Sequence, residues 1–329
     1  MRVLFQCEQL SYRGTTNSIY DYAQYNQEIL GNESAIVYSV SNPAGIDTGS
    51  IESVVTDFKD KFQVMAYGSH EELDNIASNF DFCYSQRAGL RHNMESKEIH
   101  PVVTSTNFGV HSVFQWYDPH GDVYAYISEY LSNEIAKVHN LLSTPPFVPY
   151  IVNLPDPQID LKERLGVPKD KFVFGRHGGF NTFDIPFVQD AIRRIVHEHD
   201  DIIFLFLNTE QFYSHPNIMY VEPFFDKGMM SNYITACDAM LHGRTLGESF
   251  GLSIAEFLFH NKPVLAWEGG FDRNHIQMLE NYNLLYNEQN CYDMIVNMRD
   301  RPLQDYKKIV EPFTPVNVMN KFNEVFLNA

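Results

Sequence analysis

The chain has 329 residues, of which 44% are apolar and 20% charged, and its net charge is −18. This length exceeds that of an ordinary single domain and predicts two domains of roughly 150 residues each. The negative charge argues against nucleic acid and anionic membranes as partners, because both would be repelled. It leaves room for a phosphorylated ligand in a local cationic pocket.

The first residues, MRVLFQCEQL, predict a buried strand rather than a signal peptide, because the apolar run is short and is broken by Gln6 and Glu8. No apolar run approaches the roughly 20 residues that a membrane span requires. The cysteines show no CxxC spacing, which fits reduced core thiols better than disulfides or a zinc site. They are Cys7, Cys83, Cys237 and Cys291. These features predict a cytoplasmic protein without an integral membrane segment.

Short apolar runs alternate with amphipathic stretches along the chain, which is typical of α/β units around parallel sheets. In the first half we expect strands near residues 2–6, 35–38, 63–67, 80–85, 102–105 and 123–127. We expect helices near residues 18–30, 71–78 and 129–142. Pro145, Pro146 and Pro149 then force an extended path and mark a linker.

The same alternation restarts after these prolines. Strands are expected near residues 172–176, 202–207, 219–221, 239–242, 263–267 and 284–286. Helices are expected near residues 184–199, 227–236, 252–260 and 289–299. We therefore predict two Rossmann-like, doubly wound α/β domains that face each other across a cleft, with ligands at the carboxyl ends of the strands. The predicted bounds are 1–146 and 147–310, and a C-terminal helix within 311–329 is expected to pack back on the first domain.

The most informative segment is the loop from Arg244 to Gly251 with the helix after it. A helix N-terminus presents unpaired N–H groups and a positive dipole end, which together hold a phosphate or a sugar hydroxyl. Gly251 allows a ligand to approach the backbone closely. Glu248 precedes the helix, and Glu256 lies about one turn inside and leans back toward its start. The two carboxylates suit vicinal hydroxyls; alternatively, Glu248 only balances the helix dipole and Glu256 is solvated.

The segment from Glu248 to Glu256, ESFGLSIAE, with KPV at 262–264, resembles the paired-glutamate motif of retaining GT-B glycosyltransferases of family four. Other segments resemble the family in the same order. They are Arg13-Gly14-Thr15, Ile127-Ser128-Glu129, VNLPD at 152–156 and Phe174-Gly175-Arg176. The resemblance covers the second half of the chain well and the first half loosely, and it implies the GT-B fold.

The resemblance also implies a donor site centred on the second domain. Glu256 would bind the ribose of the nucleotide, and Glu248 would bind the donor sugar. Gly14, in the family's first glycine-rich loop, would contribute to donor binding from the first domain. Three consecutive backbone N–H groups would line the sugar and the diphosphate. They belong to Phe250, Gly251 and Leu252.

The family further implies a cation at the diphosphate, and Arg176 occupies the matching position. The family pairs this Arg with a Lys about five positions later, where this chain has Asn181. Arg244 is a candidate replacement, because a planar guanidinium suits phosphate oxygens. The alternative for Arg244 is an ion pair with a neighbouring acid. We predict Arg176, Arg244 and Glu248 as the catalytic residues.

On the acceptor side, family members often place a His after the strand that corresponds to residues 102–105. Asn107 lies nearest to that position and His111 is displaced from it, so both are acceptor-side candidates. Arg87 and Arg91 either reach the cleft or stay solvated. The sequence His197-Glu198-His199 is interpreted as structural rather than metal-binding, because residues two apart on a helix diverge.

The absence of an Asp-x-Asp triplet at a strand end predicts a reaction without metal or other cofactor. The predicted function is transfer of a hexosyl or similar group from a nucleotide-sugar donor to a hydroxyl of a glycan or other acceptor, with retention of configuration. Two alternatives stay open. One is a catalytically degenerate nucleotide-sugar-binding protein, suggested by the missing Lys. The other is a nucleotide-sugar epimerase on the same fold, which should show a dedicated carboxylate acid–base pair.

Overall fold

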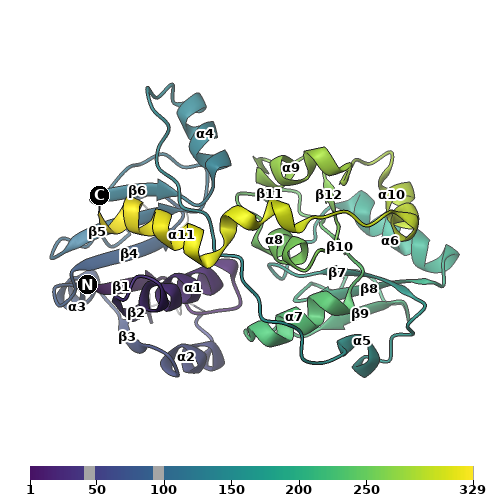
Figure 1. The fold of residues 1–329 in the computed structure, drawn as a ribbon, viewed down its shortest axis with the longest axis horizontal. Coiled ribbons are helices and arrows are strands. Elements are labelled where there is room, and N and C mark those ends of the chain that lie inside the picture. The colour runs from purple at the N-terminus through teal and green to yellow at the C-terminus, as the bar shows by residue number, and fades with distance from the viewer. Residues whose placement is uncertain (41–48, 92–99, 329) are drawn as a thin grey trace. The chain divides into compact units, whose positions relative to one another are not determined.

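A computed structural model describes residues 1–40, 49–91 and 100–328. The chain divides into two compact units (Figure 1). The first unit comprises Met1–Ile151 together with the C-terminal segment from Phe313 onward, and the second comprises Val152–Pro312. The chain thus leaves the first unit once and returns to it at the end. Within the described residues, no helix combines the length and apolar character that crossing a membrane requires.

The first unit is built on a parallel sheet that has six strands within the described residues, in the order β3-β2-β1-β4-β5-β6. The strands are β1 (Arg2–Cys7), β2 (Glu33–Ser39), β3 (Gln63–Tyr67), β4 (Phe82–Arg87), β5 (Asn107–Ser112) and β6 (Val123–Tyr126). The strand order reverses between β1 and β4. In doubly wound sheets, the carboxyl ends of two such strands are the usual place for a ligand.

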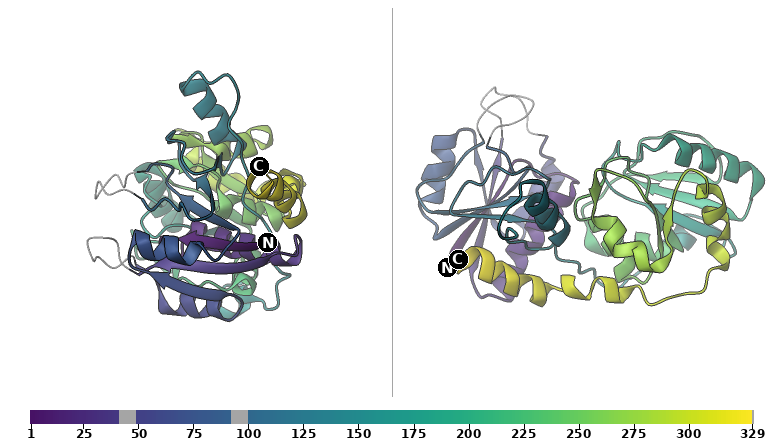
Figure 2. Two further views of the ribbon diagram at one scale, coloured as in Figure 1. Left: turned by 90° about the vertical axis from the view of Figure 1, so that its left-hand side faces the viewer. Right: turned by 90° about the horizontal axis from the view of Figure 1, so that it is seen from above.

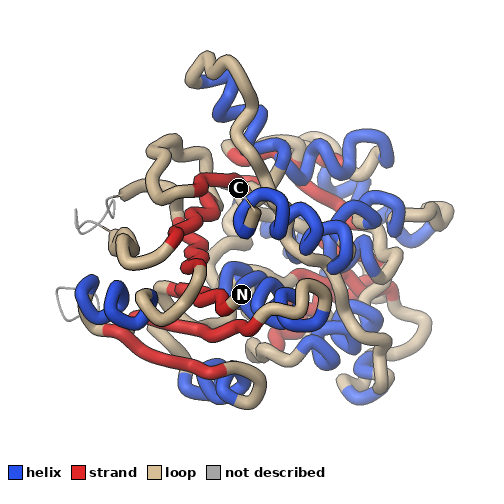
Figure 3. The backbone as a smooth tube through the Cα atoms, turned by 60° about the vertical axis from the view of Figure 1, so that its left-hand side comes forward, coloured by secondary structure: helices blue, strands red, loops and turns tan. Residues whose placement is uncertain are grey.

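Helices lie on both sides of the strands in this unit (Figures 2 and 3). They are α1 (Gly14–Glu28), α2 (Glu52–Lys59), α3 (His70–Ala77) and α4 (Glu129–Val138). Successive residues of a strand point to opposite faces, so neighbouring residues enter different cores. Cys83 of β4 packs in a cluster with Leu73 of α3, whereas the ring of Tyr84 meets that of Tyr22 of α1.

The C-terminal segment completes the core on the α1 side of this sheet. It forms α11 (Pro315–Phe322) and a π-helical turn, Asn323–Leu327. The ring of Phe322 lies 5.2 Å from the rings of Tyr22 and Tyr84, measured between centroids. The ring of Phe326 lies 5.2 Å from Tyr84 and 5.3 Å from His111. Aromatic groups from the end of the chain therefore pack against three elements of the first unit, α1, β4 and β5.

The second unit has a parallel sheet of six strands within the described residues, ordered β14-β12-β10-β7-β8-β9. Its strands are β7 (Phe172–Arg176), β8 (Ile202–Leu207), β9 (Ile218–Val221), β10 (Ala239–Leu241), β12 (Val264–Trp267) and β14 (Leu285–Tyr286). Its helices are α5 (Leu161–Arg164), α6 (Pro186–Glu198), α7 (Lys227–Ala236), α8 (Leu252–Phe259), α9 (Asn274–Leu279) and α10 (Cys291–Asn297). The order reverses between β7 and β10. The region at the carboxyl ends of these two strands, where such sheets usually form a ligand crevice, is called the crevice.

Most strands match the prediction, but the strand expected at 102–105 is wrong. The strand is β5, five residues later, Asn107–Ser112. The Asp74 carboxylate of α3 accepts the backbone N–H groups of Thr104 and Ser105, at 2.7 and 3.0 Å. Side-chain bonds to a helix thus replace the strand ladder in this β-branched stretch. The helices α2, α5 and α9 were not predicted.

His111 lies in β5 and is fully buried, with its Nδ1 atom 2.6 Å from the Tyr84 hydroxyl. Burial lowers its pKa to about 4, against the opposing effect of the Tyr126 and Val148 carbonyl groups. In the unfolded chain, His111 has an ordinary pKa near 6.5. Between pH 4 and pH 6.5 the unfolded chain therefore binds a proton at His111, whereas the native state does not. Stability contributed by His111 is therefore complete above pH 6.5 and is lost as the pH falls toward 4.

We expect the first unit to lose about 2 kcal/mol of unfolding free energy between pH 7.5 and pH 5 through His111. His111→Phe keeps a ring in the core and removes the titration, so its stability should depend less on pH by that amount. Urea unfolding of both proteins at the two pH values measures the difference. Parallel pH dependences of the two proteins would contradict the expectation.

Candidate functional site

The crevice between β7 and β10 brings together several residues that are distant in sequence. Arg176 is the last residue of β7, and His177 follows it. His242 directly follows β10, and the loop that contains Arg244 continues from there. Carboxyl ends of parallel strands at a reversal of strand order are the usual ligand site of such sheets. The position of the candidate site therefore follows from topology as well as from residue type.

Arg176 is buried, and its guanidinium group is turned into the protein. Its Nη1 atom donates to the carbonyl oxygen of Asn208 at 3.0 Å and to the Thr209 hydroxyl at 2.7 Å. Its Nη2 atom donates to the carbonyl oxygen of Gly179 at 2.9 Å and to the Thr182 hydroxyl at 2.6 Å. Arg176 thus ties the loop after β7 to the loop after β8, instead of extending freely from its strand.

The positive charge of Arg176 interacts with charged side chains at the crevice, although the groups that accept its hydrogen bonds are neutral. Burial lowers the pKa of Arg176 to about 10, and Tyr233 and the Glu248 carboxylate oppose this effect, while the Arg244 charge adds to it. An arginine stays protonated at such a pKa. Arg176, Arg244 and Glu248 are therefore close enough to influence one another electrostatically.

Glu248 has both carboxylate oxygens engaged. Its Oε1 atom lies 3.2 Å from Nε2 of His242, and its Oε2 atom accepts from Nη1 of Arg244 at 3.2 Å. Burial alone would raise the pKa of Glu248, but the hydrogen bond from His242 and the Arg244 charge lower it to about 2. Arg244 therefore forms the ion pair that was the alternative to a ligand role, although 26% of its side chain is exposed. A carboxylate with about four lone-pair positions still has acceptor capacity left.

The backbone around Glu248 is fixed by a small second sheet. The strand β11 (Gly247–Glu248) pairs in parallel with β13 (Asp272–Arg273). Gly247 adopts a φ of +77°, and a Cβ atom there would collide with the carbonyl oxygen of Asp272. Only glycine fits this close approach. Glu248 is consequently presented by a rigid turn, which favours a fixed ligand geometry.

The helix α8 begins just after Gly251, which has a left-handed φ of +89° and forms the cap residue. Leu252 is the first helical residue, and the preceding Phe250 is buried, its carbonyl oxygen accepting from Asn274 at 2.6 Å. The predicted turn into a helix N-terminus is therefore present. Its side-chain cap is missing, so its first N–H groups depend on backbone, water or ligand for partners.

Glu256 lies within α8 and is buried, not solvated. Its Oε2 atom lies 3.1 Å from Nε2 of His177, the residue that follows β7. The His177 ring stacks on Phe257 with 5.9 Å between centroids and meets Tyr233 edge-on at 6.3 Å. The Glu256 carboxylate is therefore directed toward the strand end that starts the crevice.

Three histidines of this neighbourhood were missed by the sequence prediction. His242 and His177 each contact one of the two glutamates. His275 of α9 packs behind His242, with 5.2 Å between ring centroids, and its Nε2 atom lies 2.9 Å from the carbonyl oxygen of Trp267. The available signal was positional: two of the three directly follow the strands that border the reversal of strand order.

Other predicted residues are placed as follows. Asn181, where the family has Lys, is exposed. Gly14 is the first residue of α1 in the first unit. His197 and His199 bond to the hydroxyl groups of Tyr213 and Tyr292, at 2.8 and 3.0 Å, which agrees with a structural role for both.

The acceptor-side assignment of Asn107 and His111 loses its basis, because it relied on a loop after the strand expected at 102–105. Asn107 is the exposed first residue of β5, at the amino end of the strand, where parallel sheets do not usually bind ligands. His111 is part of the core. Arg87 is also buried and bonds to Ser85, Gln6 and the carbonyl oxygen of Pro101, and Arg91 lies 3.8 Å from Asp118.

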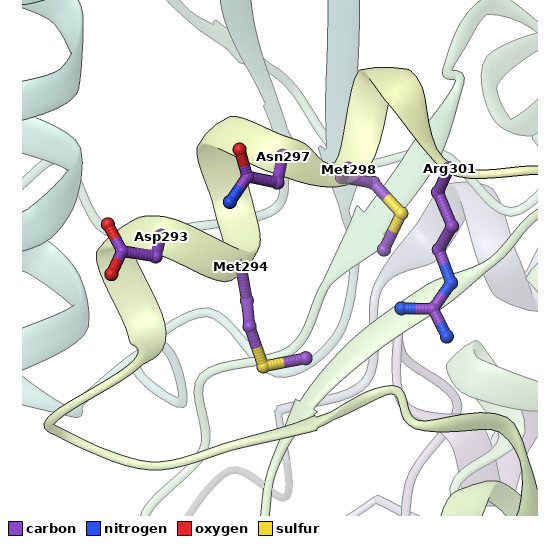
Figure 4. A pocket seen from close by; sticks show the side chains of 5 residues that line it. All are labelled: Asp293, Met294, Asn297, Met298 and Arg301. Atoms are coloured by element: carbon purple, nitrogen blue, oxygen red, sulfur yellow. The ribbon is translucent and has the colours of Figure 1, made fainter.

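A separate hollow of about 220 Å³ is formed by α10 and the turn after it. Figure 4 shows the side chains of Met294, Met298 and Arg301 pointing to the same side of this segment. Asp293 and Asn297 complete the lining. The hollow shares no residue with the cluster at β7 and β10, so it does not enter the argument for function.

No family model matches the sequence, and no curated protein matches it. Solved structures of several proteins match nearly the whole chain, including the following three. HepE of Anabaena, in complex with UDP and glucose, matches with a TM-score of 0.74 and 13% identity over 98% of both chains. A glycosyltransferase from Rickettsia africae matches with a TM-score of 0.64 and 14% sequence identity, over 99% of this chain and 94% of that chain. A UDP-N-acetylglucosamine 2-epimerase matches with a TM-score of 0.58 and 12% sequence identity, over 99% of this chain and 94% of that chain.

These similarities establish the fold. Two parallel-sheet units of six strands each, within the described residues, give the α/β architecture of GT-B glycosyltransferases. The predicted fold class is thereby confirmed. Because an epimerase shares this fold, the activity has to be argued from the site.

Proposed function

We propose that this protein is a glycosyltransferase that moves a sugar from a nucleoside-diphosphate sugar to a hydroxyl of a glycan or other acceptor, with retention and without a metal ion. One observation carries the proposal. Glu248, in the turn before α8, contacts His242, the residue that follows β10. Glu256, inside α8, contacts His177, the residue that follows β7. These two strands flank the crevice. This arrangement supports one carboxylate for the sugar and one for the ribose.

The chain itself supplies positive potential for the leaving diphosphate. As the bond to the sugar breaks, negative charge develops on the diphosphate, and preorganised donors at that position lower the barrier. Arg244 offers a partly exposed guanidinium, and the start of α8 offers N–H groups. Arg176 contributes its buried charge and holds the loops after β7 and β8. We assign Arg176 this indirect role in place of a clamp.

A uracil nucleotide is the donor we propose to test first, because HepE was solved with UDP and with UDP-glucose. Calorimetry with UDP measures binding, and release of UDP from UDP-glucose or UDP-N-acetylglucosamine measures turnover. We expect binding and slow release that an acceptor accelerates. Binding without release would favour the degenerate protein, and conversion of the sugar without release would favour an epimerase. No binding of UDP at millimolar concentration would contradict a uridine donor.

We expect turnover to persist in EDTA, because in the proposed mechanism cationic side chains of the chain, and not a metal ion, balance the charge of the diphosphate. The same release assay, run with EDTA and then with added Mg²⁺ or Mn²⁺, measures this. Rates within about twofold of each other are expected. Complete loss in EDTA with recovery by either metal would overturn the metal-independent proposal, and an inverted anomeric configuration of the product would overturn retention.

A further inference from the structure

We propose that His242 and His177 are positioning residues, one for each site glutamate: His242 orients Glu248 toward the donor sugar, and His177 orients Glu256 toward the ribose. The inference rests on the proposed function. It is carried by two contacts between Nε2 of a histidine and a carboxylate oxygen: a hydrogen bond of 3.2 Å from His242 to Glu248, and an approach of 3.1 Å between His177 and Glu256 that lacks hydrogen-bond geometry.

Both histidines are held by their surroundings, which a positioning role requires. His242 is 3% exposed, and its ring packs on that of His275. Its carbonyl oxygen accepts a hydrogen bond from the Tyr286 hydroxyl. A side chain locked by packing on one side can fix a carboxylate on the other, and such support keeps a site in its productive geometry.

The hydrogen-bonding pattern indicates a donor role for His242. Its Nδ1 atom is buried and, among the described residues, meets no hydrogen-bond partner. The Nε2 atom is therefore the nitrogen with a partner, and an N–H there donates to the Glu248 carboxylate. Arg244 binds the other oxygen of the same carboxylate. The two donors fix the plane of the Glu248 carboxylate before any sugar binds.

His177 holds Glu256 from a different element. The side chains of both residues are 10% exposed, so little water competes for their contact. The ring of His177 packs against Phe257 of α8 and Tyr233 of α7. The residue thereby connects the end of β7 to the helix that carries Glu256, and it restricts the rotamers that this carboxylate can adopt.

The two roles predict different losses. His177→Phe should weaken the affinity for UDP about tenfold, because UDP contains the ribose and the substitution removes the polar contact at 3.1 Å that restrains the Glu256 carboxylate. His242→Phe should leave the affinity for UDP within about twofold of the parent value. It should weaken the affinity for UDP-glucose about tenfold and also reduce turnover. In each case Gln, which retains an N–H donor, should recover most of the loss.

Calorimetric titration with UDP and with UDP-glucose tests this on the full chain. His199→Phe, which removes a contact to Tyr292 elsewhere in the second unit, is the matched control and should bind both ligands normally. Melting temperatures identify variants that fail to fold. Where a Phe variant does not fold, the corresponding Gln variant replaces it in the test, and its melting temperature shows whether it is folded. A folded Gln variant that binds about tenfold more weakly would overturn the proposal, whereas a folded Gln variant with normal binding supports it.

Double variants separate positioning from general damage. If His177 acts through Glu256, then His177→Phe should not reduce the affinity for UDP any further in a protein that already carries Glu256→Ala. In the same way, His242→Phe should not reduce the affinity for UDP-glucose any further in a protein that already carries Glu248→Ala. Additive losses would overturn the positioning roles. Unchanged UDP affinity in Glu256→Ala alone would instead remove Glu256 from the donor site, which is a failure of the proposed function and not of the pairing.

Discussion

Phe322→Ala is expected to lower the unfolding free energy of the first unit by about 3–5 kcal/mol, the usual cost of deleting a buried aromatic ring. Phe322 is fully buried. Its ring lies 5.2 Å from Tyr22 and Tyr84 and 6.2 Å from Phe5, on three different elements. The truncation would open a cavity in the middle of this group, and rings fixed by their own packing close such a cavity poorly.

The measurement needs a signal from the first unit alone, and the chain provides one. Its two tryptophans are Trp116 in the first unit and Trp267 in the second. In a Trp267→Phe background, the fluorescence of Trp116 during urea unfolding follows the first unit. Val316→Ala, in the same helix at a position 56% exposed, is the control and should change stability by less than about 0.5 kcal/mol. A loss below about 1 kcal/mol for Phe322→Ala would mean that the segment from Phe313 onward is dispensable.

The fold could be predicted from sequence because buried parallel strands form continuous apolar runs. IIFLFL of β8 is buried at all six positions, and its bounds match the prediction. Prediction failed where side-chain bonds decided the local structure. Asp74 determines the conformation of Thr104 and Ser105 from 30 residues away, and no periodicity within residues 102–105 contains that information.

The candidate site was predictable in part, for a related reason. Glu248, Gly251 and Glu256 are close in sequence, so a local motif places them around one turn. The partners of these glutamates are not local: His177 precedes Glu256 by 79 positions, and the contact exists only because β7 and α8 pack together. The inward direction of Arg176 depends on the loop after β8 in the same way. Residue types predicted the chemistry, whereas tertiary packing determined which atoms meet.

Arg244→Ala is expected to reduce turnover of the nucleotide sugar about 100-fold, the scale on which loss of one donor to developing negative charge is measured. Charge on the leaving diphosphate grows during the reaction, so the loss should appear more in kcat than in the affinity for UDP. Arg244→Lys should recover only part of the rate, because an ammonium group keeps the charge without the planar fork.

The pair formed by Arg244 and Glu248 makes the design of the control important, because removal of the arginine also frees a carboxylate. Arg194 and Glu198 of α6 form an ion pair with the same spacing of four residues, and 62% of the Arg194 side chain is exposed. Arg194→Ala removes an equivalent pair outside the crevice and should leave kcat unchanged, since exposed pairs of this kind contribute little. Steady-state kinetics with UDP as a competitor then compares the two variants. If Arg244→Ala retains its turnover and its inhibition by UDP, Arg244 is a partner of Glu248 only, and the positive potential at the diphosphate has to come from Arg176 and the start of α8.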